Sequence, residues 1–395
     1  MHRRRAGVSS GGFDPTRGLQ RNRDRPLSQN IVISIDAMGG DHGPAVVIPA
    51  VDIAARANPD LRFLLHGDET RINAELAKLP TAKAASTVRH TDKAISMDEK
   101  PAQAMRRGKG SSVWNAVEAV KDGDAKAAIS AGNTGALMAI SKLVLRMAAG
   151  VSRPAIVASW PTLNGVTAVL DVGANVECDA EQLVEFAIMG AAFHHAVHGS
   201  ARPTVGVLNV GSEEEKGHDE VRGAHALLRA TTFDLDYRGF VEGNDIAKGT
   251  VDVIVTDGFT GNIALKTAEG LARFFATELR ATFTSGPLEM LGALLASGGL
   301  GRMRKRMDPG AVNGGPLLGL NGIVVKSHGG ATPAGFGNAI RIAVDLARSD
   351  YLERVGSKLG RLDDILHALP STDAAADAPR TDERIVVVPS GETLQ

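Results

Sequence analysis

The chain has 395 residues, 43% of them hydrophobic, which is enough to bury a sizeable core and excludes a wholly disordered protein. A formal net charge of -1 excludes a surface that attracts nucleic acid throughout, so we expect no nucleic-acid partner, although local basic patches remain possible. The single cysteine, Cys178, excludes a disulfide framework and a multi-cysteine metal site, and it suits a reducing cytosol in which a lone thiol is inert.

Residues 1–30 and 368–395 differ in composition from the rest of the chain. The first segment is rich in arginine but has no apolar region of a secretory signal, so we interpret it as a disordered basic tail. A transit peptide is the less favoured alternative, because Asp14 and Asp24 interrupt the segment. The last segment is polar and rich in alanine and proline, which predicts a flexible tail.

No stretch approaches the roughly 18–20 apolar residues of a spanning helix, so we expect one globular cytoplasmic domain over residues 31–367.

Between the tails, short β-branched runs alternate with glycine-containing polar turns and stretches of helical periodicity. This alternation predicts a three-layer α/β/α fold with a mostly parallel central sheet. Long helices are expected over residues 181–199 and 261–283. The expected strands end in polar turns at residues 35–41, 64–69, 128–135, 170–177, 208–217, 255–262 and 325–330. Because parallel strands deliver their carboxyl ends to one edge, we expect these turns to converge there; alternatively, their glycines and asparagines only form tight turns and helix caps.

Three turns have a form that suits an anion: "DAMGGDHG" at 36–43, "SAGNTGA" at 130–136 and "DGFTGN" at 257–262. Their backbone amides can point together at a phosphate or a developing oxyanion. None is a Walker loop or a dinucleotide fingerprint, so no motif supports an ordinary nucleotide. The substrate-binding candidates at these and neighbouring strand ends are Gly39, Gly40, Asp41, Asn133, Thr134 and Asn175.

Two segments offer cations. The stretch "KPAQAMRRGKGSS" at 100–112 places Arg106 and Lys109 just before Ser111, although a solvated helix end with a serine cap explains the spacing equally well. Lys266 follows Asn262 by four residues, on the same face of the expected helix. It can reach a bound anion or pair with Glu269.

His328 directly follows a strand and is flanked by Ser327 and two glycines. A histidine there can donate to an oxyanion or move a proton; His42 is a weaker candidate. His194 and His198 are expected at the surface or in an interface, and without an HExxH pattern they do not indicate zinc. The strand-end carboxylates can hold a cation, orient a histidine or cap a helix, but no set demands a metal, so we predict no metal and no cofactor. They are Asp36, Asp41, Asp171 and Asp257.

Residues 284–310 break the strand–helix alternation. An apolar stripe of leucines is followed by a basic cluster, which suits anionic lipid or an acidic carrier protein. The alternative is a dimer-interface helix pair with a solvated basic end. The docking candidates are Leu291, Leu294, Arg302, Arg304 and Lys305.

The turns taken in order resemble the bacterial acyl-carrier-protein:phosphate acyltransferase family of the PlsX type. The resemblance runs from about Ile31 to about Ala347 and rests on "DAMGGDHGP", "SAGNTGALMA", "DVGANVE", "LNVGSEEEKG", "VTDGFTGNIALKTAEG" and "GLNGIVVKSHG". Two departures, Val113 where the family often has methionine and Val312 where an aromatic residue is common, do not touch the proposed chemistry.

The resemblance implies that acyl carrier protein donates a long-chain fatty acyl group from its thioester to inorganic phosphate, giving acyl phosphate for phospholipid synthesis. It also implies a homodimer at the inner face of the cell membrane, in contact with a downstream glycerol-phosphate acyltransferase that uses acyl phosphate. The fold would be similar to isocitrate/isopropylmalate dehydrogenases and phosphotransacetylase, with residues 31–367 as the catalytic domain and 284–310 as a helical insertion. Similarity to phosphotransacetylase segments suggests Asn262, Lys266, Ser327 and His328 as site members.

These residues suggest a mechanism in which glycine-turn amides and a nearby cation hold phosphate beside the thioester, while His328 stabilises the oxyanion. Two rival hypotheses remain. A dehydrogenase that oxidises a hydroxy acid with a nicotinamide cofactor would need a metal-binding carboxylate cluster, and no convincing one is found. A non-catalytic membrane or carrier-protein scaffold is disfavoured by the glycine-rich turns.

Overall fold

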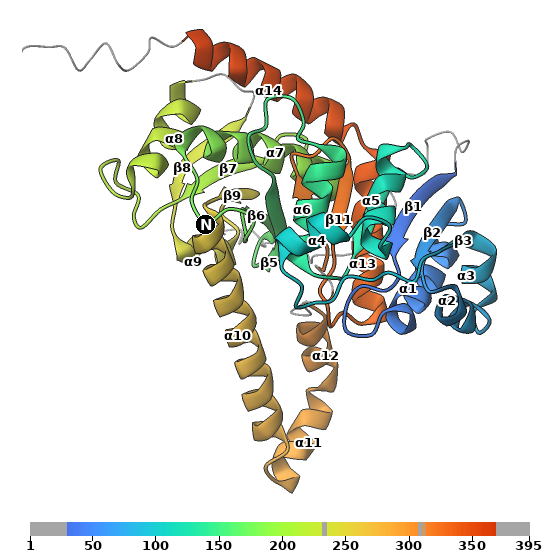
Figure 1. The fold of residues 1–395 in the computed structure, drawn as a ribbon. Coiled ribbons are helices and arrows are strands. Elements are labelled where there is room, and N and C mark those ends of the chain that lie inside the picture. The colour runs from blue at the N-terminus through green and yellow to red at the C-terminus, as the bar shows by residue number, and fades with distance from the viewer. Residues whose placement is uncertain (1–29, 231–234, 307–309, 311–312, 369–395) are drawn as a thin grey trace, which may run out of the picture.

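The computed structural model describes residues 30–230, 235–306, 310 and 313–368 (Figure 1). Apart from residues 30 and 368, the two predicted tails lie outside this range, as does Val312. None of the helices described is long and apolar enough to cross a bilayer.

The strands described form one 11-stranded sheet in the order β3-β2-β1-β4-β11-β10-β5-β6-β9-β7-β8. In chain order the strands are β1 (Ile31–Asp36), β2 (Leu61–Gly67), β3 (Ser86–His90), β4 (Ala127–Ser130), β5 (Ala155–Thr162), β6 (Gly165–Leu170), β7 (Thr204–Leu208), β8 (Asp236–Val241), β9 (Val253–Val255), β10 (Gly315–Leu318) and β11 (Ile323–Lys326).

Helices follow most of the strands, and both expected long helices form within a few residues of their predicted bounds. The helices described are α1 (Pro44–Ala57), α2 (Glu69–Leu76), α3 (Pro80–Ala85), α4 (Pro101–Arg107), α5 (Ser112–Lys121), α6 (Thr134–Leu145), α7 (Ala180–His198), α8 (Asp219–Ala230), α9 (Gly243–Lys248), α10 (Gly258–Phe283), α11 (Pro287–Leu295), α12 (Ser297–Arg306), α13 (Pro333–Arg348) and α14 (Tyr351–Ala368).

Alternate residues of the central strands face opposite sides of the sheet, as the pleat requires. Ile33 and Ile35 of β1 belong to one apolar core together with residues of α1, α7 and α13. Ala128 of β4 and Val324 of β11 belong to a second core with residues of α5 and α6. Helices therefore cover both faces, which confirms the predicted three-layer α/β/α fold.

The strands do not all run in one direction. β10 is antiparallel to its neighbours β11 and β5, and β5 is antiparallel to β6. The other neighbouring strands described pair in parallel, so the sheet is mostly parallel as predicted. Because of the three reversals, β6, β9, β7 and β8 run against β1, β4 and β11. The prediction that all the polar turns share one edge is therefore wrong, and they form two groups.

The helices α10, α11 and α12 project from the body of the protein, and we call them the arm (Figure 1). The arm contains residues 284–306 of the expected insertion and starts earlier, where α10 follows β9. The buried residues of α10, Gly258 and Gly261, lie at this root. The chain returns from α12 through Gly310 and Asn313 to β10, whose first residue pairs with the last residue of β11. Each root of the arm therefore meets one group of turns.

Candidate active site

The turns that follow β1, β4 and β11 pack together, and we call them the first turn cluster. Asp36 ends β1, is buried, and accepts a hydrogen bond at 2.7 Å from the Ser130 hydroxyl at the end of β4. The Ser130 oxygen in turn accepts from the Gly132 amide at 3.0 Å. Burial raises the pKa of Asp36, and hydrogen bonds from Ser130, Ser112 and the backbone oppose that rise. Two adjacent strand ends are thus joined through one carboxyl group.

The glycine pair after β1 allows these turns to approach closely. A Cβ on Gly39 would lie 2.6 Å from a carboxylate oxygen of Asp36 and 2.7 Å from the Gly132 amide nitrogen. Gly40 has a φ of +86°, and a Cβ there would lie 2.9 Å from the carbonyl oxygen of Gly329. The next amide, that of Asp41, donates to the same carbonyl at 3.0 Å. Both glycines are therefore needed for backbone contact between the turns.

The turn after β11 carries Ser327 and His328. Ser327 is fully buried; its amide donates to the Ser130 carbonyl at 2.9 Å, and its hydroxyl accepts from the Asn313 side chain at 2.8 Å. The Asn313 oxygen accepts from the His328 amide at 2.9 Å. The His328 side chain is exposed, and its Nδ1 accepts from the Gly330 amide at 3.1 Å. The neutral ring therefore carries its proton on Nε2, which remains able to donate.

Lys326 lies in the same cluster and was missed by the sequence reasoning, as was Asn313. It is partly buried, and its Nζ donates to the carbonyl oxygens of Ala131, at 3.3 Å, and of Ser327. Burial lowers the pKa of Lys326 to about 8, and the carboxylates of Asp36 and Asp41 oppose this fall. The available signal was a lysine that ends a strand directly before Ser327 and His328.

The turns that follow β6 and β9 form the second turn cluster, which is built around Asp171. This fully buried carboxylate accepts from the backbone amides of Ile156, Gly173, Ala174 and Asn175 and from the Asn175 side chain. Burial raises its pKa, and these hydrogen bonds oppose the rise. The first residue of α10 joins the same turn, because the Gly258 amide donates to the Asn175 carbonyl at 2.7 Å.

Comparison with known proteins decides the family. Residues 31–354 match the model of a family described as fatty acid synthesis protein. A phosphate acyltransferase of Caulobacter vibrioides is 71% identical over 347 residues, which cover 88% of this chain and 96% of the relative. A phosphate acyltransferase of Phenylobacterium zucineum is 60% identical over 351 residues, covering 89% and 99%. The chain belongs to this family of phosphate acyltransferases. It is therefore an acyltransferase, as predicted.

Solved structures of phosphotransacetylases share the fold of this phosphate acyltransferase. One from Streptococcus pyogenes superposes with a TM-score of 0.56 at 18% identity, covering 80% of this chain and 94% of that one. The EutD phosphotransacetylase of Staphylococcus aureus gives a TM-score of 0.54 at 16% identity with the same coverage.

The predicted phosphate-binding residues of the acyltransferase differ in exposure, and some of them cap helices. Arg106 and Lys109 are exposed at and just beyond the end of α4. Ser111 is buried and caps α5, since its hydroxyl accepts from the Trp114 amide at 3.4 Å. Asn133 caps α6 and also donates to the carbonyl of Met97 at 2.6 Å, while Thr134 beside it is exposed.

The remaining candidates belong to the second cluster. Asn175 is buried and donates to the carbonyl of Pro154 at 2.8 Å as well as to Asp171, so its side chain holds the turn. Asn262 is exposed on the first turns of α10. Lys266, also exposed, forms an ion pair of 2.9 Å with Glu269. Asp257 caps α10 by accepting from the Thr260 amide at 2.8 Å.

His194, His42 and Cys178 differ in their exposure. His194 is buried and contacts the carbonyl of Val166 at 3.2 Å, so the expectation of a surface or interface position is wrong for it. His42 is exposed. Cys178 is buried, which raises the pKa of its thiol to about 12 and keeps it protonated and unreactive at neutral pH. Among the described residues, no group of three or more histidine, cysteine or acidic side chains is placed to hold a metal ion.

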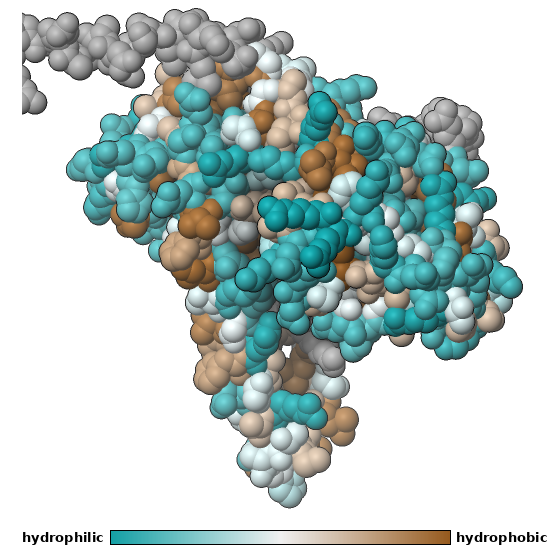
Figure 2. All heavy atoms as spheres, viewed as in Figure 1, coloured by the Kyte–Doolittle hydropathy of each residue, from teal (hydrophilic) through white to brown (hydrophobic). Residues whose placement is uncertain are grey.

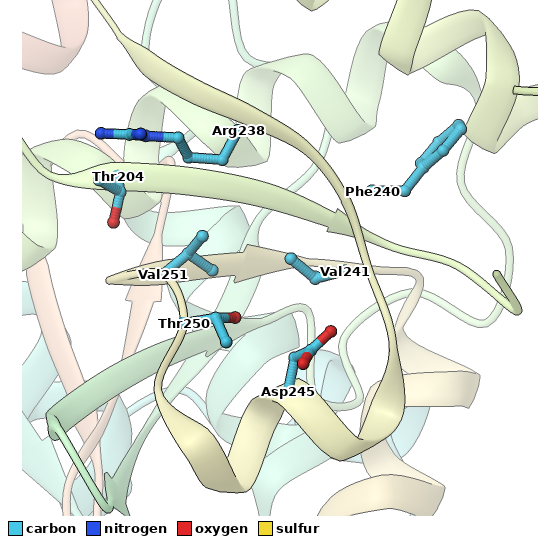
Figure 3. A pocket seen from close by; sticks show the side chains of 7 residues that line it. All are labelled: Thr204, Arg238, Phe240, Val241, Asp245, Thr250 and Val251. Carbon is cyan, nitrogen blue, oxygen red and sulfur yellow. The ribbon is translucent and has the colours of Figure 1, made fainter. Parts of the chain in front are cut away.

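An open cavity of about 410 Å³ lies elsewhere, between β7, β8 and α9 (Figure 3). Its charged side chains are already engaged, Arg238 with Asp236 at 2.8 Å and Asp245 with Lys248 at 3.0 Å. Its lining includes none of the residues of the two turn clusters. The cavity is therefore separate from the turn clusters that carry the predicted site residues. The residues around the cavity are Thr204, Arg238, Phe240, Val241, Asp245, Thr250 and Val251.

Proposed function

We propose that this acyltransferase transfers a long-chain fatty acyl group from the thioester of acyl carrier protein to inorganic phosphate, and that the acyl phosphate serves phospholipid synthesis. The packing of three glycine-containing strand-end turns around Asp36 and Ser130 carries the proposal. Such turns suit an anion, because several backbone amides can approach it without interference from side chains. Membership of the phosphate acyltransferase family supports the transfer of an acyl group to phosphate.

Phosphate is held at the first turn cluster and attacks the thioester carbonyl directly. Its dianion is already nucleophilic, so holding it beside the carbonyl supplies much of the rate enhancement. The proposed substrate-binding residues here are Gly39, Gly40 and Asp41, with Arg106 and Lys109 as exposed cations. The amides of Gly39 and Asp41 already bind the Asp36 carboxylate and the Gly329 carbonyl, so the Gly40 amide is the donor proposed for phosphate. No covalent acyl-enzyme is required.

His328 stabilises the oxyanion that forms on the thioester carbonyl. Its free donor is Nε2, because Nδ1 is occupied by the Gly330 amide at 3.1 Å. Asn313 fixes the backbone beside the ring, since it binds the amide of His328 and the hydroxyl of Ser327. A donor of this kind typically contributes about 3–4 kcal/mol to transition-state stabilisation.

Asn262 and Lys266 extend the site to the first turns of α10. Both side chains are exposed where the arm leaves the second cluster. Lys266 would exchange its exposed partner Glu269, at 2.9 Å, for the anionic substrate. The free-energy cost of breaking this ion pair is small, because exposed ion pairs contribute about 0–1 kcal/mol.

The arm is proposed to serve in dimerisation and in peripheral contact with the membrane and carrier protein. Apolar side chains lie along it and near its tip (Figure 2). Leu291 is 53% and Leu294 69% exposed in α11, and Arg302 is exposed in α12, while the side chains of Arg304 and Lys305 lie outside the described part. A large exposed apolar surface of this kind marks an interaction site. We propose that the arm contacts the inner face of the cell membrane and that the protein there meets the downstream glycerol-phosphate acyltransferase.

One incubation tests the catalytic proposal. The purified protein is mixed with acyl carrier protein thioester and inorganic phosphate, and acyl phosphate and freed thiol are quantified. Equal amounts of both products are expected, and omission of phosphate should abolish them. The same assay with an acyl coenzyme A donor compares the two carriers. Reduction of a nicotinamide cofactor by a hydroxy acid, without acyl phosphate, would instead support a dehydrogenase.

Vesicle flotation tests the arm. Leu291→Asp together with Leu294→Asp should remove binding to vesicles of anionic phospholipid while activity on dissolved substrates persists. A matched change at an exposed leucine of the body, Leu163→Asp, should leave vesicle binding intact. Unchanged binding of the arm variant would oppose the membrane proposal, and a shift from dimer to monomer would assign the leucines to the subunit interface.

A further inference from the structure

Lys326 connects the parts of the first turn cluster. It ends β11, which lies between β4 and β10 in the sheet. Its Nζ donates to the carbonyl oxygens of Ala131, at 3.3 Å, and of Ser327. Ala131 belongs to the turn after β4 and lies against Gly40 of the turn after β1. One amino group therefore binds two of the three turns and lies close to the third.

The two carbonyl acceptors leave one free position on this nitrogen. A charged lysine has three N–H donors, whereas the neutral amine has two and a lone pair. When two hydrogens are engaged by carbonyl oxygens, the last tetrahedral position holds either the third hydrogen or the lone pair. A proton can therefore enter and leave there without loss of the two hydrogen bonds that hold the side chain.

Acyl transfer to phosphate moves one proton. In the balanced reaction, RCO–SR′ and HPO₄²⁻ give RCO–OPO₃²⁻ and R′SH. A C–O bond forms, the C–S bond breaks with its electron pair on sulfur, and the phosphate proton ends on that sulfur. Nδ1 of His328 is not free to carry the proton, because it accepts from the Gly330 amide.

We propose that Lys326 carries this proton, taking it from hydrogen phosphate as the C–O bond forms and returning it to the departing thiolate. The inference rests on the proposed function. Asp36 at the end of β1 and Asp41 in the following turn are the charged groups that act on Lys326. The paired residues on its two neighbouring strands, Ser130 of β4 and Gly315 of β10, are uncharged.

The ionisation of Lys326 suits this role. Burial lowers its pKa to about 8, so the neutral amine is available near neutral pH while the ammonium remains abundant. The negative charges of Asp36 and Asp41 act in the opposite direction and raise the pKa of Lys326. A lysine that only neutralised phosphate would gain nothing from a lowered pKa.

The first test compares Lys326 with Lys326→Arg. Arginine keeps the positive charge and the donors but does not deprotonate. With both substrates saturating, wild-type kcat should rise with pH up to about 8. The arginine variant should lose that rise and about 100-fold or more of kcat. Ionisation of phosphate affects both proteins equally, so the difference between their profiles reports the lysine. A variant that keeps both kcat and the rise would overturn the proposal.

The second test varies the leaving group in Lys326→Met. An aryl thiolate leaves without a proton, so the defect in kcat should shrink by at least about tenfold relative to an alkyl thioester. Equal defects with both donors would contradict proton return by Lys326. Lys126→Met is the matched control, because Lys126 is exposed at the opposite end of β4. If the methionine variant fails to fold, the arginine comparison decides. Absence of acyl phosphate from the wild type would reject the proposed function itself.

Discussion

The two turn clusters each contain a buried aspartate at a strand end, but they use it differently. Asp171 accepts hydrogen bonds from four backbone amides and one side-chain amide. Its carboxylate oxygens are therefore engaged in stabilising the turn from which α10 begins. Asp36 accepts from the Ser130 hydroxyl and the Met38 amide, and Ser112 and the Gly39 amide also lower its pKa, while Lys326 and the exposed His328 lie in the same cluster. Similar sequence patterns thus build an anchor in one place and the proposed reactive site in the other.

The largest effect is expected for the anchor. Asp171→Ala should lower the free energy of unfolding by about 3–5 kcal/mol, because several buried amides each lose an acceptor at about 1–3 kcal/mol. Urea unfolding measures the change. Asp36→Ala should cost less stability, since fewer hydrogen bonds end on that carboxylate. Equal losses in the two variants would remove the distinction between the clusters.

His328→Ala should act on catalysis and leave stability unchanged. Loss of the Nε2 donor should reduce kcat by about 100- to 1,000-fold. The side chain is exposed, so the free energy of unfolding should change by less than about 0.5 kcal/mol. Initial rates of acyl phosphate formation and a denaturant titration check the two parts. Retention of full activity would remove His328 from the site.

Gly39→Ala should also reduce activity. The added Cβ would meet the Asp36 carboxylate at 2.6 Å and the Gly132 amide at 2.7 Å, so the turns must move apart. A displacement near 1 Å at a catalytic site costs roughly 100-fold in rate. Gly337→Ala in α13 is the control, because its Cβ would have only an ordinary contact at 4.0 Å. Similar activity of both variants would show that close approach of the turns is dispensable.

The smallest effect is expected for Lys266→Ala. The exposed ion pair with Glu269 contributes at most about 1 kcal/mol to stability. If Lys266 binds phosphate, KM for phosphate should rise by about tenfold, the equivalent of about 1.4 kcal/mol. Steady-state kinetics at varied phosphate concentrations measure this. An unchanged KM would confine the second cluster to its anchoring role.

The fold class and most turn positions were predictable, because hydrophobic periodicity and glycine-rich strand ends are local signals. The reversal of half the sheet was not predicted. Two of its antiparallel pairings join strands that are adjacent in the chain, but the pairing of β10 with β5 joins residues about 160 positions apart. Lys326 was missed for a related reason. Its role depends on Ala131, which lies 195 residues away in the chain. The sequence was also compatible with two roles for Asn133 and Ser111, substrate binding and helix capping. Local hydrogen bonds identify both residues as helix caps.

The position of β10 and β11 has a consequence for the order of folding. These two strands come late in the chain yet lie in the middle of the sheet, between β4 and β5. A growing chain that has reached the arm still lacks Lys326, Ser327 and His328, and it also lacks the strands that join the two halves of the sheet. Non-local pairings of this kind form slowly. The enzyme should therefore gain activity in one late step, when the β10–β11 pair inserts and closes a sheet whose two sides are already formed.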